Sequence, residues 1–357
     1  MSDFQLRIAP VKVRFGAGVR RHLAEEVEAL GACRALILST SGRAETARQL
    51  ASGLGGRACG TFAKAAMHTP VEVTREAVAK ATDLQADCII AVGGGSTTGL
   101  GKAIAYRTDL PQIVVPTTYS GSEATPILGQ TENGIKTTLT DSKVQPEVIL
   151  YDAELVQGLP VGITVTSALN AMAHAVETLY AKDRNPLSSA LALEGLKAFR
   201  EALPAVIKSP HDLNARGKTL YGAWLCGSVL GQVGMALHHK LCHTLGGSFG
   251  LPHAETHAIL LPHTAAYNEG AVREILQPAA DLFGGGLGDG LYAFAGQMGA
   301  PRALRDIGLN RSDLDKAVEL AVRNPYWNPR PVERSAIREL LQRAFEGAPP
   351  EDIDGRS

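Results

Sequence analysis

The stretch CIIAVGGGSTTGLGKAIA, residues 88–105, decides the fold of this chain. Its first five residues, Cys88–Val92, are typical of a buried strand. The three glycines of Gly93–Gly95 let the backbone approach a ligand closely. Ser96–Thr98 can cap a helix, and the free N–H groups of a helix start favour a phosphate. The spacing matches neither the GxGxxG nor the P-loop pattern, so a strand-to-helix turn without a ligand remains an alternative.

A second turn of the same kind follows the next apolar run. Ile113–Val115 leads into PTTYSGSEATP, residues 116–126, which is rich in hydroxyl groups and glycine. Open α/β sheets bind ligands at the carboxyl ends of adjacent strands. The two turns together therefore predict one bound ligand more firmly than either turn does alone, and two ordinary loops are the alternative.

The rest of the chain separates into two parts. Up to residue 155, β-branched runs alternate with helical segments, which predicts an α/β domain with a parallel sheet. Residues 156–357 predict an all-helical domain. The predicted strands are Val11–Phe15, Ala35–Ser39, Gly60–Phe62, Cys88–Val92, Ile113–Val115 and Val148–Tyr151. The predicted helices are Arg21–Ala29, Arg43–Leu54, Val71–Leu84, Gly99–Tyr106, Thr166–Ala181, Leu187–Leu203, Leu213–His243, Ala271–Leu282, Gly290–Met298, Arg311–Arg323 and Val332–Phe345.

Composition excludes several classes of partner. With 357 residues and a formal net charge of −1, the chain has no charge surplus for a nucleic acid or an anionic membrane. Five scattered cysteines without CxxC spacing, and a start (MSDFQLRIAP) unlike a signal segment, predict a cytoplasmic protein. The uncharged run Thr219–Leu237 is interpreted as a buried core helix rather than a membrane span, because glycines and polar residues dilute its hydrophobicity.

The stretch LHHKLCHTLGGSFGLPHAETHAILLPH, residues 237–263, holds six of the ten histidines. Imidazole binds metals and exchanges protons near neutral pH, so such a cluster suggests a reaction site. Asn170 and His174 are four residues apart in a helical pattern, as are His239 and His243, so each pair shares a helix face. With His253 after the glycine-rich loop, these side chains predict a metal or proton-transfer site. Core packing of single histidines is the alternative.

Four blocks carry a resemblance to a known family: GGGSTTGLGKAIA, PTTYSGSEATPILGQTENGIKT, LHHKLCHTLGGSFGLPHAETHA and NPYWNPRPVERSAIRELLQRAFEG. They resemble the iron-containing (group III) alcohol dehydrogenase superfamily, of dehydroquinate synthase-like architecture, and more closely its maleylacetate reductase branch. The resemblance covers essentially the whole chain. It implies a Rossmann-like N-terminal domain, a helical C-terminal domain and substrate in the cleft between them. It also implies a homodimer that reduces 2-maleylacetate to 3-oxoadipate with NADH or NADPH during the breakdown of aromatic compounds.

The resemblance also implies functional residues. The pyrophosphate turn falls on Gly93, Gly94, Gly95 and Ser96, and the nicotinamide-side loop on Thr117, Thr118 and Ser122, while Thr97, Ser39 and Thr40 are further candidate cofactor contacts. We expect His243 to donate a proton and His253 and His239 to stabilise an oxyanion, with His174 and Lys240 in the same catalytic set. The candidate substrate contacts are Asn170, Arg323, Arg330 and Tyr326, the arginines and Lys240 serving as carboxylate partners.

The chain departs from the metal-dependent relatives at the positions of their ligands, one aspartate and three histidines. The matching residues are Asn170, His174, His239 and His253, so the only anionic ligand is missing. The resemblance therefore implies that no metal is required; three imidazoles, those of His174, His239 and His253, would hold one if it bound. Gly99 stands where the metal-dependent relatives usually carry aspartate.

Cofactor choice and two rival functions stay open. The segment from Ser39 to Arg43 lacks the acid that often binds an NAD ribose, and Arg43 could meet a 2′-phosphate, so we expect use of both cofactors. One rival is an iron- or zinc-dependent alcohol or polyol dehydrogenase on the same scaffold. The other is a nucleotide-binding protein without catalytic activity.

Overall fold

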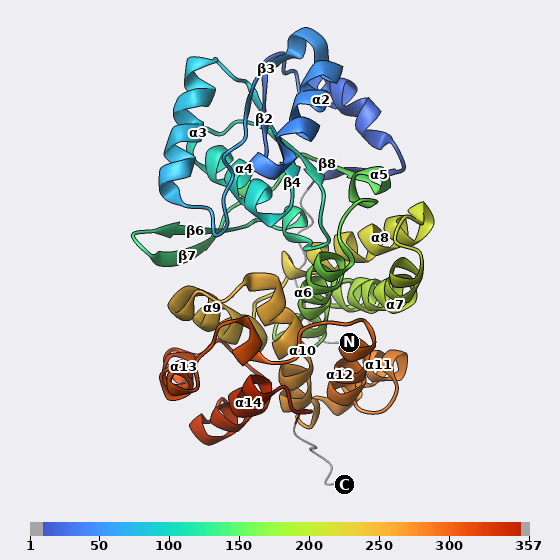
Figure 1. Cartoon of the computed structure of the whole chain (residues 1–357), viewed down its shortest axis with the longest axis vertical. Coiled ribbons are helices and arrows are strands. Elements are labelled where there is room, and N and C mark those ends of the chain that lie inside the picture. Colours follow the sequence, from blue (N-terminus) through green and yellow to red (C-terminus); the bar gives the residue numbers. More distant parts are fainter. Residues whose placement is uncertain (1–9, 351–357) are drawn as a thin grey trace. The chain divides into compact units, whose positions relative to one another are not determined.

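The computed structural model describes residues 10–350, which form two compact units. One unit holds the described chain up to residue 159 and the segment 211–220; the other holds residues 160–210 and the described chain from residue 221 onward. Figure 1 shows a sheet flanked by helices in the first unit and helices alone in the second. The predicted fold class, an α/β nucleotide-binding part followed by an all-helical part, is confirmed.

The sheet of the first unit has six parallel strands in the order β1-β8-β5-β4-β2-β3. Apolar residues on one face, among them Ile37 and Ile90, pack against Leu23 and Ala47 of the covering helices. On the other face, residues such as Ile89 pack against the remaining helices. The strands are β1 (Lys12–Gly16), β2 (Ala35–Leu38), β3 (Ala58–Phe62), β4 (Cys88–Gly93), β5 (Gln112–Pro116) and β8 (Val148–Asp152). The helices are α1 (Leu23–Ala29), α2 (Ala44–Leu54), α3 (Val71–Asp83), α4 (Gly95–Thr108) and α5 (Ala153–Val156).

Burial explains why the central strands could be recognised from sequence. Every residue of β4 and β5 is buried, because helices cover both faces of the sheet. Strands in that position are apolar throughout rather than alternating, as the sequence of Cys88–Val92 shows. The strand order reverses between β2 and β4, since β3 lies outside β2 while β5 lies outside β4. Ligands bind at such a point in open α/β sheets.

The second unit is built from helices α6 to α14, of which α8 begins in the segment 211–220 of the first unit, and its core lies between α9, α10, α13 and α14. The helix α6 is buried from Thr164 to Tyr180, which requires a segment that is apolar on nearly all sides. The helices are α6 (Val161–Tyr180), α7 (Pro186–Lys208), α8 (Leu213–Leu230), α9 (Leu237–Phe249), α10 (His253–Glu269), α11 (Arg273–Phe283), α12 (Leu287–Gln297), α13 (Leu314–Val322) and α14 (Arg334–Glu346).

The sequence predictions of secondary structure were wrong at three of the larger elements. The single helix predicted for Leu213–His243 is two helices, because the amides of Gly234 and Ala236 turn toward the carboxylates of Asp183 and Glu177 and interrupt the helix. The second error is the helix α10, which was not predicted. It begins at His253 and continues past an internal proline, Pro262.

The third error is the antiparallel hairpin of β6 (Ile127–Glu132) and β7 (Ile135–Thr140), for which no strand was predicted. Its turn residues Asn133 and Gly134 both have positive φ, of 50° and 74°. An Asn-Gly pair is a strong signal for such a turn, so this hairpin was recognisable from sequence.

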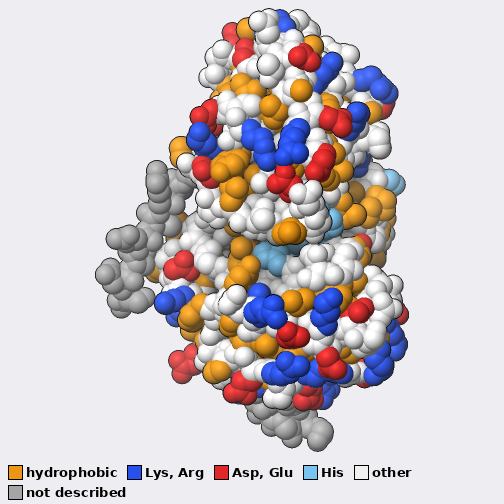
Figure 2. Space-filling view, turned by 90° about the vertical axis from the view of Figure 1, so that its left-hand side faces the viewer, with side chains coloured by type: hydrophobic (Ala, Val, Ile, Leu, Met, Phe, Trp, Pro, Cys, Tyr) orange, Lys and Arg blue, Asp and Glu red, His pale blue; other side chains and the backbone are white. Residues whose placement is uncertain are grey.

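The returning segment 211–220 is tied into the sheet unit by Arg216. This side chain is fully buried and donates hydrogen bonds to the carbonyl oxygen of Leu159 (2.8 Å) and to the hydroxyl of Tyr119 (3.2 Å). The sequence predicted the boundary between the two parts of the chain at residues 155–156. In the structure the chain passes from the first unit to the second between Leu159 and Pro160. No helix within residues 10–350 is long and apolar enough to cross a membrane. On the face drawn in Figure 2, basic and acidic side chains are interspersed.

Candidate active site

The glycine turn and the hydroxyl loop lie at neighbouring strand ends in the sheet unit. Strands β4 and β5 pair in parallel with Gly93 opposite Pro116, and the amide of Thr117 donates to the carbonyl oxygen of Gly93 (2.9 Å). Gly94 lies so close to Thr118 that an added Cβ would come within 2.7 Å of its side chain. The two turns that the sequence singled out therefore share one edge of the sheet, as predicted.

The start of α4 differs from the prediction. The helix begins at Gly95, not Gly99, and its N-cap is Gly94, without a side-chain cap. Ser96–Thr98 therefore lie inside the first turn and do not cap it. The amides of Thr97 and Thr98 bond to the carbonyl oxygen of Gly94, whereas Gly95 and Ser96 are the exposed and half-buried residues of the turn. Their N–H groups are the ones suited to a phosphate.

The other candidate cofactor residues differ in accessibility. Ser122 and Thr118 are half-buried, and Ser122 Oγ lies 3.3 Å from Ser120 Oγ. At the end of the adjacent strand β2, Thr40 is half-buried but Ser39 is fully buried. Ser39 therefore presents no hydroxyl to a ligand in this conformation, and Thr40 is the better candidate of the two.

In the helical unit, histidines from three helices form one cluster. The ring of His239 on α9 has its centroid 5.1 Å from that of His174 on α6 and 5.2 Å from that of His257 on α10. His257 in turn lies 4.4 Å from His253, again between ring centroids. The predicted side chains are thus brought together. His263, which the sequence grouped with them, lies instead against Tyr292.

A buried carboxylate that the sequence analysis missed supports this cluster. Glu177 Oε2 lies 2.5 Å from His239 Nδ1, and Nε2 of His239 lies 3.1 Å from His174 Nδ1. Although burial raises the pKa of Glu177, the facing His239 and two backbone amides lower it overall, so the carboxylate is charged. A charged carboxylate accepts the hydrogen bond from Nδ1 of the ring and so fixes the ring's orientation. The signal in the sequence was an acid three residues after His174 in an apolar helix.

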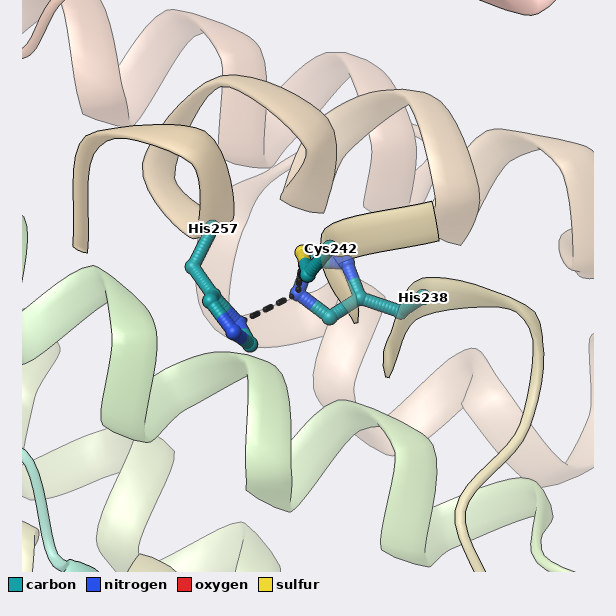
Figure 3. Close-up of side chains that lie close together, drawn as sticks. All are labelled: His238, Cys242 and His257. Atoms are coloured by element: carbon teal, nitrogen blue, oxygen red, sulfur yellow. Dashed lines mark hydrogen bonds between the residues drawn. The ribbon is translucent and has the colours of Figure 1, made fainter. Parts of the chain in front are cut away.

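Figure 3 shows a second buried group, formed by His238 and Cys242 of α9 with His257 of α10. Thr264 Oγ1 donates to the carbonyl oxygen of Leu260 (3.0 Å) and so accepts from Nδ1 of His238 (2.9 Å). His238 Nε2 then accepts from His257 Nδ1 (2.8 Å), and Nε2 of His257 is left as an acceptor without a hydrogen-bond partner among the described residues. Burial lowers the pKa of both rings well below the ordinary value, in keeping with these neutral tautomers.

His243 and Tyr326 form the more accessible side of the cluster. His243 is half-buried, its ring lies 5.9 Å from that of His239, and its Nδ1 lies 3.2 Å from the Tyr326 hydroxyl. Burial, together with Glu177, raises the pKa of Tyr326, so this hydroxyl keeps its proton at neutral pH. Lys240 Nζ lies 5.7 Å from the ring centroid of Tyr326 and donates to the carbonyl oxygen of Arg323 (3.0 Å).

The two candidate arginines do not join this group. The Arg323 side chain is exposed and pairs with Glu319 at 2.8 Å. The Arg330 guanidinium lies 4.2 Å from the centroid of Tyr267 and donates to its carbonyl oxygen (3.2 Å). Of the three predicted carboxylate partners, Lys240 is the one that the structure places beside Tyr326, whose hydroxyl contacts the candidate proton donor.

Comparison with known proteins identifies the family of this chain. Residues 10–153 match the model of the iron-containing alcohol dehydrogenase family, and residues 164–345 match that of the C-terminal part of the same family. The chain therefore belongs to the iron-containing alcohol dehydrogenase family, whose members are nicotinamide-dependent oxidoreductases.

Individual relatives narrow the class further. A maleylacetate reductase of Rhizobium sp. (strain MTP-10005) is 62% identical over 98% of this chain and 100% of its own length. One from Burkholderia cepacia is 51% identical over 97% of this chain and 98% of its own. The crystal structure of maleylacetate reductase from Agrobacterium tumefaciens, 61% identical, matches with a TM-score of 0.95 over 98% of this chain and 100% of that one.

The family name raises the question of a metal, which the donor atoms can test. Asn170 Oδ1 is buried without a hydrogen-bond partner among the described residues, and Glu177 orients His239 as a carboxylate orients a metal-binding histidine. Together with His174 and His253 these residues fit a divalent ion in donor type. The set contains no anion, however, so its affinity for a cation is lower than that of a set with aspartate.

Proposed function

We propose that this chain is a maleylacetate reductase, which uses NADH or NADPH to reduce the conjugated carbon–carbon double bond of maleylacetate and forms 3-oxoadipate. The observation that carries the proposal is the histidine cluster backed by Glu177, with His243 and Tyr326 on its accessible side. The relatives described above, named for this activity, support it.

The reaction defines what the protein must supply. Hydride from the reduced nicotinamide adds to the alkene carbon β to the ketone, and negative charge develops on the ketone oxygen as an enolate. The carbon next to the ketone then takes a proton, so that one hydride and one proton are added. Donors positioned at the oxygen stabilise the enolate, and a proton source completes the reduction.

The helical unit supplies these groups in our proposal. His253 donates to the enolate oxygen. His239 is a positioning residue in this conformation, because its Nδ1 is held by Glu177 and its Nε2 is paired with Nδ1 of His174. His243 gives the proton to carbon and is re-protonated through the Tyr326 hydroxyl. Lys240 binds a carboxylate of the substrate, where its ammonium supplies the charge that the two arginines do not bring to this group.

The sheet unit binds the cofactor in the same proposal. The amides of Gly95 and Ser96 hold the pyrophosphate, and Thr118 and Ser122 line the nicotinamide side. After β2 the chain continues as Ser39–Arg43 with no acid, which supports the use of both NADH and NADPH. From the unpatterned cysteines of the sequence we propose a cytoplasmic protein, and from the resemblance a homodimer.

We further propose that no metal is required. A divalent ion held by Asn170, His174, His239 and His253 would act as a Lewis acid on the ketone oxygen when bound. The imidazoles provide equivalent donors to that oxygen, and the neutral ligand set disfavours the ion.

One experiment tests the function. Oxidation of NADH and of NADPH is followed by absorbance with maleylacetate, and with simple alcohols and aldehydes as comparison substrates, before and after treatment with a chelator. Rapid oxidation with maleylacetate that survives chelation is expected. Turnover of alcohols that is lost on chelation and restored by iron or zinc would assign the chain to the metal-dependent branch instead.

A further inference from the structure

Lys102 is a buried cation that the mechanism above does not use. It lies on α4, whose N-terminus forms the glycine turn, and is only 2% exposed. Its Nζ lies 2.6 Å from the carbonyl oxygens of both Ser122 and Thr125, and 3.0 Å from that of Ile127. The Thr125 hydroxyl oxygen also lies 3.0 Å from this nitrogen. One ammonium group thus contacts four oxygen atoms of a six-residue segment.

The contacted segment, Ser122–Ile127, belongs to the hydroxyl loop. It follows β5 and opens with the short 3-10 helix η4 (Ser122–Ala124). Three carbonyl groups of this short segment converge on the ammonium group, which has three N–H donors. An apolar side chain at position 102 would fill space but would remove the ammonium donor that the carbonyl oxygens of Thr125 and Ile127 share.

The contacts also set which side chains of the loop face outward. Glu123 and Thr125 are buried, whereas Ser122 and Ala124 are half-buried. The inward direction of Glu123 is fixed by a hydrogen bond from the Tyr151 hydroxyl (3.0 Å). Lys102 and Tyr151 therefore hold the loop through its buried side. Ser122 is the residue whose side chain this arrangement leaves accessible to a ligand.

Burying an ammonium group is costly, and this cost argues that the contact is kept for more than packing. Burial lowers the pKa of Lys102 to about 7, against a smaller opposing effect of Glu123. Isolated buried cations destabilise a fold unless they are fully hydrogen-bonded. Here the hydrogen bonds join the helix of one cofactor turn to the backbone of the other.

We propose that Lys102 is a positioning residue for the nicotinamide cofactor, holding Ser122–Ile127 in the conformation that contacts it. This inference rests on the proposed cofactor site and not on the identity of the substrate. It predicts that loss of the ammonium weakens cofactor binding while the KM for maleylacetate stays unchanged.

The test compares Lys102→Met with Lys143→Met in the full-length chain. Lys143 is in the same unit but is about half exposed and pairs with Asp109, so it is the matched control. NADH binding is measured by fluorescence without any keto acid, and thermal unfolding is recorded for each variant. We expect Lys102→Met to raise the Kd for NADH about tenfold or more and Lys143→Met to change it less than about twofold.

A milder variant covers the case in which Lys102→Met does not fold. Thr125→Val keeps the shape of the side chain but removes the hydroxyl that contacts Lys102 Nζ and the carbonyl oxygen of Ser122 (3.0 Å). It is expected to raise the Kd for NADH about threefold. The proposal is overturned if folded Lys102→Met binds NADH as the wild type does. Where that variant is unfolded, an unchanged Kd in Thr125→Val overturns it.

These outcomes are distinguishable from failure of the proposed function. A wild-type chain that binds NADH but does not reduce maleylacetate would refute the proposed function. The role of Lys102 would still be decided by the Kd for NADH of the variants. A wild-type chain that binds neither NADH nor NADPH would overturn the inference together with the cofactor site.

Discussion

The carboxylate of Glu177 and the imidazole of His239 form a buried hydrogen bond, with Oε2 and Nδ1 2.5 Å apart. Glu177 also accepts hydrogen bonds from the amides of Ala236 and His239, at 3.1 and 3.3 Å. The same carboxylate thus fixes the start of α9 and the orientation of the His239 ring. A substitution of Glu177 therefore affects both the start of α9 and the position of a side chain in the candidate active site.

Replacing Glu177 by Gln is expected to lower kcat about 10- to 100-fold, because the carboxylate that orients the ring of His239 is lost. The KM for NADH should change less than twofold, since the proposed cofactor site lies in the sheet unit. Steady-state kinetics with varied NADH check the split. A matched variant is Glu255→Gln, a half-buried acid on α10, which should retain kcat. A Glu177→Gln enzyme with wild-type kcat would contradict the role given to His239.

His243→Ala is expected to reduce kcat by about 10²- to 10⁴-fold, the usual contribution of a general acid. Tyr326→Phe removes only the hydroxyl beside Nδ1 of His243 and should have a smaller effect, about tenfold. Single-turnover measurements in heavy water show whether proton transfer has become slower. If His243→Ala folds normally and turns over as the wild type, another group is the proton donor.

Asn170→Asp is expected to convert the histidine cluster into a better cation site. The unpaired carbonyl oxygen of Asn170 becomes a carboxylate, which compensates the charge of a divalent ion. At a zinc concentration of about 100 times its Kd, binding stabilises the variant by about 2.7 kcal/mol. Melting temperatures with and without zinc measure this. Equal shifts in wild type and variant would mean that the ion binds elsewhere.

His263 should make the fold sensitive to acid. Burial, with a contribution from Arg343, lowers its pKa from 6.5 to about 4. Between these values the unfolded chain binds a proton that the folded chain does not, so stability rises with pH and is lost as pH falls from 6.5 toward 4. The free energy of unfolding falls by about 3 kcal/mol, on account of this residue, between pH values above 6.5 and pH values below 4.

Denaturant unfolding between pH 4 and 7 tests this for His263→Phe, which removes the titrating group. Its free energy of unfolding should depend less on pH than that of the wild type. The control is His211→Gln, at an exposed position, which should retain the wild-type slope. Parallel curves for His263→Phe and wild type would show that other groups dominate the acid loss.

Gly94→Ala is expected to weaken NADH binding about tenfold or more. The new Cβ would come within 2.7 Å of the Thr118 side chain, and relieving such overpacking costs roughly 1–3 kcal/mol or moves the loop. The comparison is Gly53→Ala on α2, where nothing lies within 4 Å of an added Cβ. Fluorescence titration measures both. Wild-type affinity in Gly94→Ala would separate this turn from the cofactor.

The sheet was predictable because its strands are buried on both faces and read as apolar runs ending in glycine or hydroxyl residues. The pairing of β4 with β5, which brings Gly93 and Thr117 together, followed from that pattern. The break after α8 was not predictable from periodicity, because it depends on amides of the loop bonding to Asp183 and Glu177 from distant helices. Tertiary contacts decided it.

The candidate site was predicted in part for similar reasons. Helical spacing indicated that His239 and His243 share a face, and the structure places both in the cluster. The tautomer of His257, in contrast, is set by a hydrogen-bonded chain through His238 and Thr264, which no local pattern encodes. The direction of a long side chain such as Arg323 is also not given by spacing, and the structure turns it toward Glu319.

Arg216 makes the sheet unit depend on chain that is encoded much later. A fragment ending at Leu159 would lose the donor to its own last carbonyl group and to the Tyr119 hydroxyl. During synthesis the first 159 residues therefore emerge as an incomplete unit, whose final closure waits for the segment 211–220. A gene fragment meant to produce this unit by itself would have to carry that later segment as well, joined by a short artificial linker.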